Sequence, residues 1–468
     1  MSLSASTGAV QPRRLGKNER RAVMSGTLGS AFEYFDFAVF GALSATLFPT
    51  LFFGNLGSTA GLLVSFATFG VGFVARPLGA MFFGHLGDKI GRLPVLYTTL
   101  ATMGVCTIVI GLLPTGRGVV VATILVILRF VQGFSLGGET TGNQLVVMEH
   151  GRSHRRGLLS SFIIIGSPLS QVMANLLLAL LTSVLSQSQW QSWGWRIPFL
   201  SSIVIVAVAV FVRLRLEETP AFVADRAARQ AAEASPAKAD RGAGSGARVL
   251  LKQPGKIAQL ALALGGSAFS FYLIAVYGLN LLTKQFGFSS SSTFAILLTA
   301  NALSVPLCVL GGWVSDRMGR KRPFVVGLLG NLAGILIFFF SAPTGSFLLI
   351  TLGATLALGS VQFVSAIYPA LYAEQFPTRF RYAGSALSFA FANLFFSAPA
   401  PFVAAAVSSA AGTHAVLWLT VGLLVISVLA TLSVRERNRV DLAAFREVPA
   451  GQPDQEVVPG KIVERTEG

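Results

Sequence analysis

Long apolar segments run through almost the whole chain, and they constrain its fold more than any other feature. A helix needs about 20 mostly apolar residues to cross the hydrocarbon core of a bilayer. Segments of this kind lie at Val23–Leu51, Gly61–Phe83, Val95–Leu113, Val119–Val147, Leu158–Leu185, Ile197–Leu216, Ile257–Leu282, Thr293–Val314, Phe324–Ser341, Phe347–Ala373, Gly384–Val407 and Ala415–Val434. The sequence therefore predicts an all-α membrane protein with twelve transmembrane helices.

The composition agrees with a chain that meets lipid directly. Of the 468 residues, 53% are hydrophobic and 12% are charged, whereas a soluble protein carries about 25% charged residues. The formal net charge is +16, which in a soluble protein would suggest nucleic-acid binding. Here the excess lies in loops between apolar segments, so we expect a lipid bilayer and no nucleic acid as the partner.

Lys and Arg residues gather in alternate loops, and such residues mark the cytoplasmic side. With the N-terminus inside, the outer loops hold at most Arg117, Lys284 and Arg196. This asymmetry predicts a multi-pass protein of the bacterial inner membrane with both termini in the cytoplasm. The expected parts are a tail at 1–22, a six-helix bundle at 23–216, a linker at 217–256, a second bundle at 257–434 and a tail at 435–468.

One short pattern occurs twice, after the second span of each half. Asp88 and Asp316 occupy the same place in the two copies and are 228 positions apart (316 − 88 = 228). The first copy contains Gly84, Asp88, Gly91 and Arg92, and the second contains Gly312, Asp316, Arg317, Gly319 and Arg320. The repeat predicts two pseudo-symmetric bundles of parallel topology, the design that underlies alternating access.

The repeated pattern resembles the signature of the major facilitator superfamily. Its glycines permit a tight turn, and its carboxylate is placed to accept hydrogen bonds from a helix N-terminus or to pair with a loop arginine. Such a clasp would hold one conformation and release it in another. The resemblance therefore implies a conformational gating role for Gly84, Asp88, Gly91, Arg92, Asp316, Arg317, Gly319 and Arg320.

Further blocks are similar to the metabolite:proton symporter family, which includes shikimate, oxoglutarate, citrate and proline/betaine carriers. The blocks are Glu33 to Phe37, Arg76 to Asp88, Arg129 to Glu139, Trp193 to Leu200, Glu218 to Phe222 and Ala373 to Arg379. The resemblance implies proton-coupled uptake of a small organic acid or zwitterion by alternating access. An efflux antiporter of the same fold is the alternative, followed by a membrane-embedded enzyme or sensor.

Two acidic residues lie within the first span. Glu33 and Asp36 are three residues apart, so they share a helix face. Nearby carboxylates in a low dielectric disfavour double ionisation, and one of them could hold a proton near neutral pH. We expect this pair to couple protons, with Asp36 favoured because it lies deeper in the span. A structural pair capped by an arginine is the alternative.

Two arginines lie within the second and fourth spans. Arg129 shares a face with Gln132, and this combination suits a carboxylate ligand. We expect Arg129, Gln132 and Arg76 to bind substrate. The alternatives are a structural salt bridge of Arg129 with Glu139 or a first-span acid, and, for Arg76, a counter-ion for Asp36 or snorkelling to the interface.

Short sequence patterns that resemble enzyme or metal sites lack the structural surroundings that such sites need. Gly133 to Gly137 matches a nucleophile elbow, but that motif needs a strand-to-helix turn, and here it lies in an apolar helix. His150 and His154 lie in a basic loop and have no Cys or Asp partner there, and no phosphate-binding Gly-Lys-Ser/Thr loop occurs. We expect a monomeric transporter that is not an enzyme and that uses no cofactor or metal.

Overall fold

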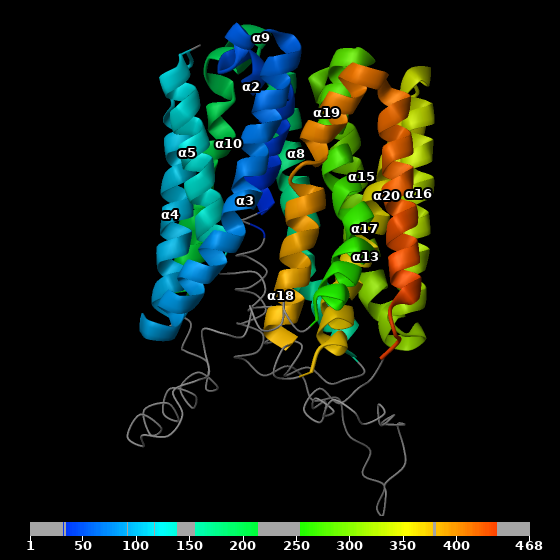
Figure 1. The fold of residues 1–468 in the computed structure, drawn as a ribbon. Helices are drawn as coiled ribbons and strands as arrows, with labels where there is room; N and C mark the ends of the chain where they lie inside the picture. The colour runs from blue at the N-terminus through cyan, green and yellow to red at the C-terminus, as the bar shows by residue number, and fades with distance from the viewer. Residues whose placement is uncertain are drawn as a thin grey trace, which may run out of the picture.

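The computed structural model describes residues 31, 34–90, 92–116, 118–137, 155–213, 253–377 and 381–437. Every element in these ranges is a helix, as expected where lipid offers the backbone no hydrogen-bond partner. Figure 1 shows two groups of upright helices side by side, with α3, α4, α5 and α10 of the first half in one group, α13 to α20 of the second half in the other, and α8 where the groups meet.

The first half begins with a helix at 34–46. The elements that follow it are α2 (Phe48–Leu51), η1 (Gly54–Leu56), α3 (Ser58–Ile90), α4 (Arg92–Leu112), α5 (Val119–Leu136), α7 (Arg156–Ile164), α8 (Gly166–Val184), α9 (Gln187–Gln189), η3 (Trp190–Gly194) and α10 (Arg196–Arg213).

The second half contains a seventh span in which two π-helical turns flank a short α-helical turn. Its elements are α13 (Pro254–Tyr272), η4 (Leu273–Tyr277), α14 (Gly278–Asn280), η5 (Leu281–Gln285), α15 (Ser290–Met318), α16 (Lys321–Ser341), η6 (Ala342–Thr344), α17 (Phe347–Gln375), α18 (Arg381–Ala392), η7 (Asn393–Ser397), α19 (Ala400–Ala411) and α20 (Thr413–Ser433).

The helices match the twelve expected spans in order. Among the described residues, 9 helical segments are long and apolar enough to cross a membrane. The remaining spans correspond to the helix at 34–46 with α2, to α4, and to α10. The predicted all-α transmembrane fold is therefore confirmed.

The repeated pattern lies differently from the turn that the sequence suggested. Helix α3 continues through Gly84 and Asp88 to Ile90, and α15 continues through Asp316 to Met318. In the second copy the turn is made by Gly319, whose φ of 88° lies in the left-handed region that favours glycine. Asp88 and Asp316 thus belong to the last turn of a helix, and the loop follows them.

Helices α3 and α5 approach each other through small residues. A Cβ added at Gly133 would overlap the carbonyl of Gly72, and one at Gly79 would overlap the carbonyl of Phe134. Small residues at such an interface let two backbones come into direct contact, which supplies packing energy in lipid. This close approach brings Arg129 on α5 beside the face of α3.

The two halves contact each other near both ends of the molecule. We call the end where α3 and α15 terminate the inner end, since the sequence predicts that it faces the cytoplasm, and the opposite end the outer end. Near the outer end, Asn280 Nδ2 donates a hydrogen bond of 2.9 Å to the carbonyl of Ala45. Near the inner end, α15 packs against α7, and the contact continues along α8 toward the outer end.

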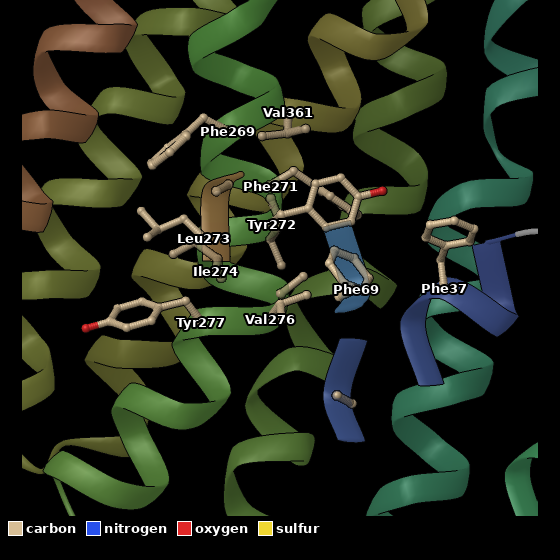
Figure 2. Packing of buried hydrophobic residues seen from close by; sticks show 14 of the residues in the cluster. Phe37, Phe69, Phe269, Phe271, Tyr272, Leu273, Ile274, Val276, Tyr277 and Val361 are labelled. Carbon is tan, nitrogen blue, oxygen red and sulfur yellow. The ribbon is translucent and has the colours of Figure 1, made fainter. Parts of the chain in front are cut away.

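Aromatic residues fill the middle of the interface between the halves. Tyr272 on α13 packs against Phe69 and Phe73 on α3, with ring centroids 5.5 and 5.2 Å apart. Figure 2 shows Tyr272 pointing from its helix toward Phe69 and Phe37 of the first half. The same rings lie next to the charged cluster described below.

The glycine contact between α3 and α5 predicts a large effect for one methyl group. Gly133→Ala would force the helices apart, since the added Cβ meets backbone and not a movable side chain. Overpacking of this kind costs about 1–3 kcal/mol, so we expect a lower unfolding temperature in detergent. Gly422→Ala on α20 is the control, because its Cβ would have no heavy atom within 4 Å. An equal effect of the two substitutions would contradict this account.

Candidate functional site

A buried ion pair connects two helices of the first half. Asp36 Oδ2 on the helix at 34–46 lies 3.0 Å from Arg129 Nη1 on α5, and both side chains are fully buried. A charge at the bilayer centre costs about 2.5–3.5 kcal/mol on insertion scales, and breaking a buried pair by removing one partner costs about 3–5 kcal/mol. Each of the two charges therefore depends on the other to stay inside the bundle.

Gln132 and Thr107 complete this group, which we call the Asp36 cluster (Asp36, Thr107, Arg129 and Gln132). The Thr107 hydroxyl on α4 lies 2.9 Å from Asp36 Oδ1. Gln132 Nε2 lies 3.2 Å from each carboxylate oxygen and 2.7 Å from Thr107 Oγ1. Gln132 Oε1 in turn accepts from Arg129 Nη1 at 3.2 Å. Donors from three side chains thus converge on one carboxylate.

Aromatic rings enclose the guanidinium of Arg129. Its Cζ lies 3.9 Å from the ring centroid of Phe37 and 4.3 Å from that of Phe40. Gly72 leaves room for it, because a Cβ there would come within 3.1 Å of Arg129 Nε. Nε and Nη2 of Arg129 have no hydrogen-bond partner among the described residues. Because unmatched buried donors are costly, these N–H groups are suited to the acceptor of a ligand.

Arg76 lies on α3 beside the same rings. Its Cζ is 4.4 Å from the ring centroid of Phe37 and 4.8 Å from that of Phe73, so Phe37 is flanked by two guanidinium groups. Contacts of this type are favourable by about 0.5–2 kcal/mol. The structure thus brings Arg76, Arg129, Gln132 and Asp36 into one region. Glu33 and Glu139 lie outside the described residues, and the role predicted for Glu33 stays a prediction.

A second charged group lies near the inner end, which we call the Arg320 cluster (Arg156, Asp316, Arg320 and Glu374). Arg320 Nη1 lies 2.8 Å from Asp316 Oδ1, and Arg320 Nη2 lies 3.2 Å from Glu374 Oε1. Arg156 Nη1 on α7 of the other half lies 3.9 Å from the same Glu374 oxygen. The side chains of Arg320 and Glu374 are fully buried, so the charges are held by one another.

Asp316 also binds the N-terminus of a helix in the opposite half. Its two carboxylate oxygens accept hydrogen bonds from the backbone N–H groups of Gly157 and Leu158 on α7, at 2.8 and 2.9 Å. A helix N-terminus favours an anion, so this bond holds α15 against α7. Burial alone would lower the pKa of Arg320, but the Glu374 and Asp316 carboxylates raise that pKa above its ordinary value.

The other residues predicted to gate lie in several places. Gly319 makes the turn after α15, whereas Arg317 is exposed and places its Cζ 3.7 Å from the ring centroid of Trp313. In the first copy, Gly84 and Asp88 lie in the last turns of α3 and Arg92 begins α4, while Gly91 lies outside the described residues. The gating role of both copies stays a prediction.

Sequence reasoning does not identify Thr107 or Glu436. Thr107 is a single small polar residue in an apolar span, where a hydroxyl usually bonds its own helix. Glu436 follows α20 and accepts from the backbone N–H groups of Arg320 and Lys321 at 2.9 and 2.8 Å, which caps the N-terminus of α16. No local signal marks either contact, because Asp36 is 71 positions from Thr107 and Arg320 is 116 positions from Glu436.

Comparisons with known proteins agree with this architecture. The chain is 31% identical over 426 residues to the shikimate transporter of Escherichia coli, covering 90% of this chain and 95% of that protein. It is 33% identical over 434 residues to the inner membrane metabolite transport protein YhjE of Escherichia coli, covering 90% and 96%. It is 29% identical to the proline/betaine transporter of Escherichia coli, covering 79% and 74%.

A solved structure shares the fold. The structure of the proton:xylose symporter XylE superposes with a TM-score of 0.74 at 17% identity, covering 93% of this chain and 100% of that chain. The sequence also matches the family model of the Major Facilitator Superfamily over residues 26–398 and 260–463. The chain is a multi-pass membrane transporter, and it belongs to the Major Facilitator Superfamily.

Proposed function

We propose that the chain is a proton-coupled symporter that carries a small organic acid or zwitterion into the cytoplasm. In this proposal it acts as a monomer in the bacterial inner membrane, with both termini on the cytoplasmic side. Asp36 carries the coupling proton, with Glu33 as its neighbour on the same helix. Arg129, Gln132 and Arg76 contact the substrate, and the two bundles rock about a midplane site.

The observation that carries this proposal is the fully buried ion pair between Asp36 and Arg129. A proton that binds Asp36 neutralises the carboxylate and removes the charge that holds the Arg129 guanidinium. The guanidinium then needs another anion, since an unpaired buried charge is strongly destabilising. A substrate carboxylate meets that need, so proton binding and substrate binding support each other.

The substrate class follows from the donors that the site offers. A guanidinium binds a carboxylate through two parallel N–H bonds, and Nε and Nη2 of Arg129 have no partner among the described residues. The rings of Phe37 and Phe40 offer apolar surface beside them. Relatives named as shikimate and proline/betaine transporters support a carboxylate-bearing metabolite of similar size.

Contacts near the two ends supply the alternating gates. Near the inner end, Asp316 holds the N-terminus of α7, and Arg320, Glu374 and Arg156 connect the two halves. Near the outer end, Asn280 holds Ala45. We infer that one group of contacts breaks while the other persists, because a site open at both ends would dissipate the proton gradient. We expect the repeated pattern with Gly84, Asp88, Gly91 and Arg92 to have the matching gating role in the first half.

Replacing the coupling carboxylate tests the proton step. In Asp36→Asn the amide that replaces the carboxylate does not ionise, so we expect uptake driven by a pH gradient to fall to background. The measurement is uptake of labelled shikimate, proline and glycine betaine by proteoliposomes, with the pH gradient imposed from outside. Exchange of labelled for unlabelled substrate at equal pH is the control for folding, and we expect it to persist. Full gradient-driven uptake by Asp36→Asn would show that the proton binds elsewhere.

The inner contacts can be tested with a native reporter. Cys308 on α15 is fully buried, and its thiol lies 3.8 Å from the carbonyl of Ser161 on α7. Asp316→Asn weakens the bond to α7, so we expect alkylation of Cys308 by N-ethylmaleimide to become several-fold faster. The background is Cys106→Ser, and Arg322→Gln at an exposed position is the charge control. Unchanged labelling of Cys308 in Asp316→Asn would rule out a clasp at this point.

A further inference from the structure

We propose that Thr107 is a positioning residue for the proton step, which donates to Asp36 when the carboxylate is ionised and withdraws from it when the proton binds. The inference rests on the proposed function, because it assigns a partner to the residue that carries the proton there. Thr107 does not contact substrate in this account; it acts through Asp36.

The hydroxyl of Thr107 has two acceptors within reach. Its Oγ1 lies 2.9 Å from Asp36 Oδ1 and 3.0 Å from the carbonyl oxygen of Met103, four residues back on α4. A hydroxyl has one proton, so it donates to only one of them at a time. Its lone pairs accept from Gln132 Nε2 at 2.7 Å. The geometry therefore allows two hydrogen-bonded states that differ by rotation of one bond.

The charge of Asp36 selects between the two states. A hydrogen bond to an ionised acceptor is about twice as strong as one between neutral groups, so the hydroxyl donates to Asp36 while the carboxylate is charged. After protonation, the Met103 carbonyl becomes a comparable acceptor, and the bond returns to the helix. Thr107 is 1% exposed in relative terms, so water does not compete, and neither state leaves its proton unmatched.

Two buried threonines on α20 show the hydrogen bond that is ordinary for this residue type in a helix. Thr420 on α20 is fully buried and donates to the carbonyl of Val416, four residues back, at 2.8 Å. Thr431 on the same helix donates in the same way to Ser427 at 2.7 Å. The bond of Thr107 to the Met103 carbonyl is thus common for a threonine in a helix. What distinguishes Thr107 is a second acceptor, the buried carboxylate of Asp36 on another helix.

The other donors to Asp36 stay in place when the hydroxyl is removed. Arg129 and Gln132 reach it from α5. Among the described residues, the further titratable or charged groups near this ion pair are Arg76 on α3, the Cys106 thiol on α4 and Tyr272 on α13. Thr107→Val keeps these groups and nearly keeps the volume of the side chain, and it removes both the hydroxyl donor to Asp36 and the acceptor of Gln132 Nε2. A change in the variant therefore reports on the hydroxyl.

The test is an infrared difference titration of the full-length protein in proteoliposomes, without substrate. The band of interest is the carbonyl stretch of protonated Asp36, identified by its loss in Asp36→Asn. Removing a donor from the carboxylate makes protonation easier, so in Thr107→Val we expect the midpoint of this band to move about one unit to higher pH. Thr107→Ser restores the midpoint, and Thr420→Val leaves it unchanged.

The outcomes separate this inference from the proposed function. A midpoint that does not move in Thr107→Val, that moves to lower pH, or that moves equally in Thr420→Val overturns the role of Thr107 alone. The absence of any titrating band that Asp36→Asn removes overturns both proposals. A shifted band combined with uptake that ignores the pH gradient leaves the hydrogen bond established and removes the symport proposal.

Discussion

Arg129 carries a full positive charge among phenylalanine rings in the middle of a membrane bundle, and Asp36 is what allows it to stay there. The two side chains have no access to solvent, so neither gains hydration to replace its partner. Anything that neutralises one of them changes the environment of the other at once. The proposed coupling of a proton to a carboxylate substrate rests on that dependence, because each ligand would alter the partner available to Arg129.

The same principle acts near the inner end, where the pairing crosses between the halves. Asp316 and Glu374 neutralise Arg320, and Asp316 also uses the partial positive charge at the N-terminus of α7. A network of several charges fixes geometry better than an isolated surface pair, whose contribution is about 0–1 kcal/mol. Its strength depends on the halves staying together, which makes it suited to hold one conformation and to be released in another.

Close packing of helices places both clusters. Gly72 and Gly133 let the backbones of α3 and α5 touch, and this sets how deeply Arg129 enters the ring of aromatic side chains. Gly157 and Gly312 form a similar contact between α7 and α15, which brings the N–H groups of α7 within reach of Asp316. These glycines keep the helix backbones close together, and a single added methyl group would move a charged side chain away from its partner.

The number of spans, the repeat and the charged residues inside the membrane can all be predicted from the amino-acid sequence. These features are local: a run of apolar residues, a spacing of 228 positions, or a carboxylate inside an apolar helix can each be read without knowing any neighbour. The prediction that Asp36 and Arg129 matter came from the cost of burying a charge, which applies wherever the chain folds. The helix ends differ from the prediction, since α3 and α15 extend further than the turn pattern indicates.

Which of these groups contact each other depends on how the helices pack. The rotation of each helix about its axis determines that Arg129 faces Asp36 and that Thr107 donates to the same carboxylate. The contact of Glu436 with the N-terminus of α16 also depends on the packing. A rotation of one helix changes every partner without changing any hydropathy pattern, because lipid and the bundle interior are both apolar. The hydrophobic periodicity of an apolar helix therefore does not show which face is buried. The hydrogen-bond and ion-pair partners of its polar side chains depend on the packed arrangement of the helices.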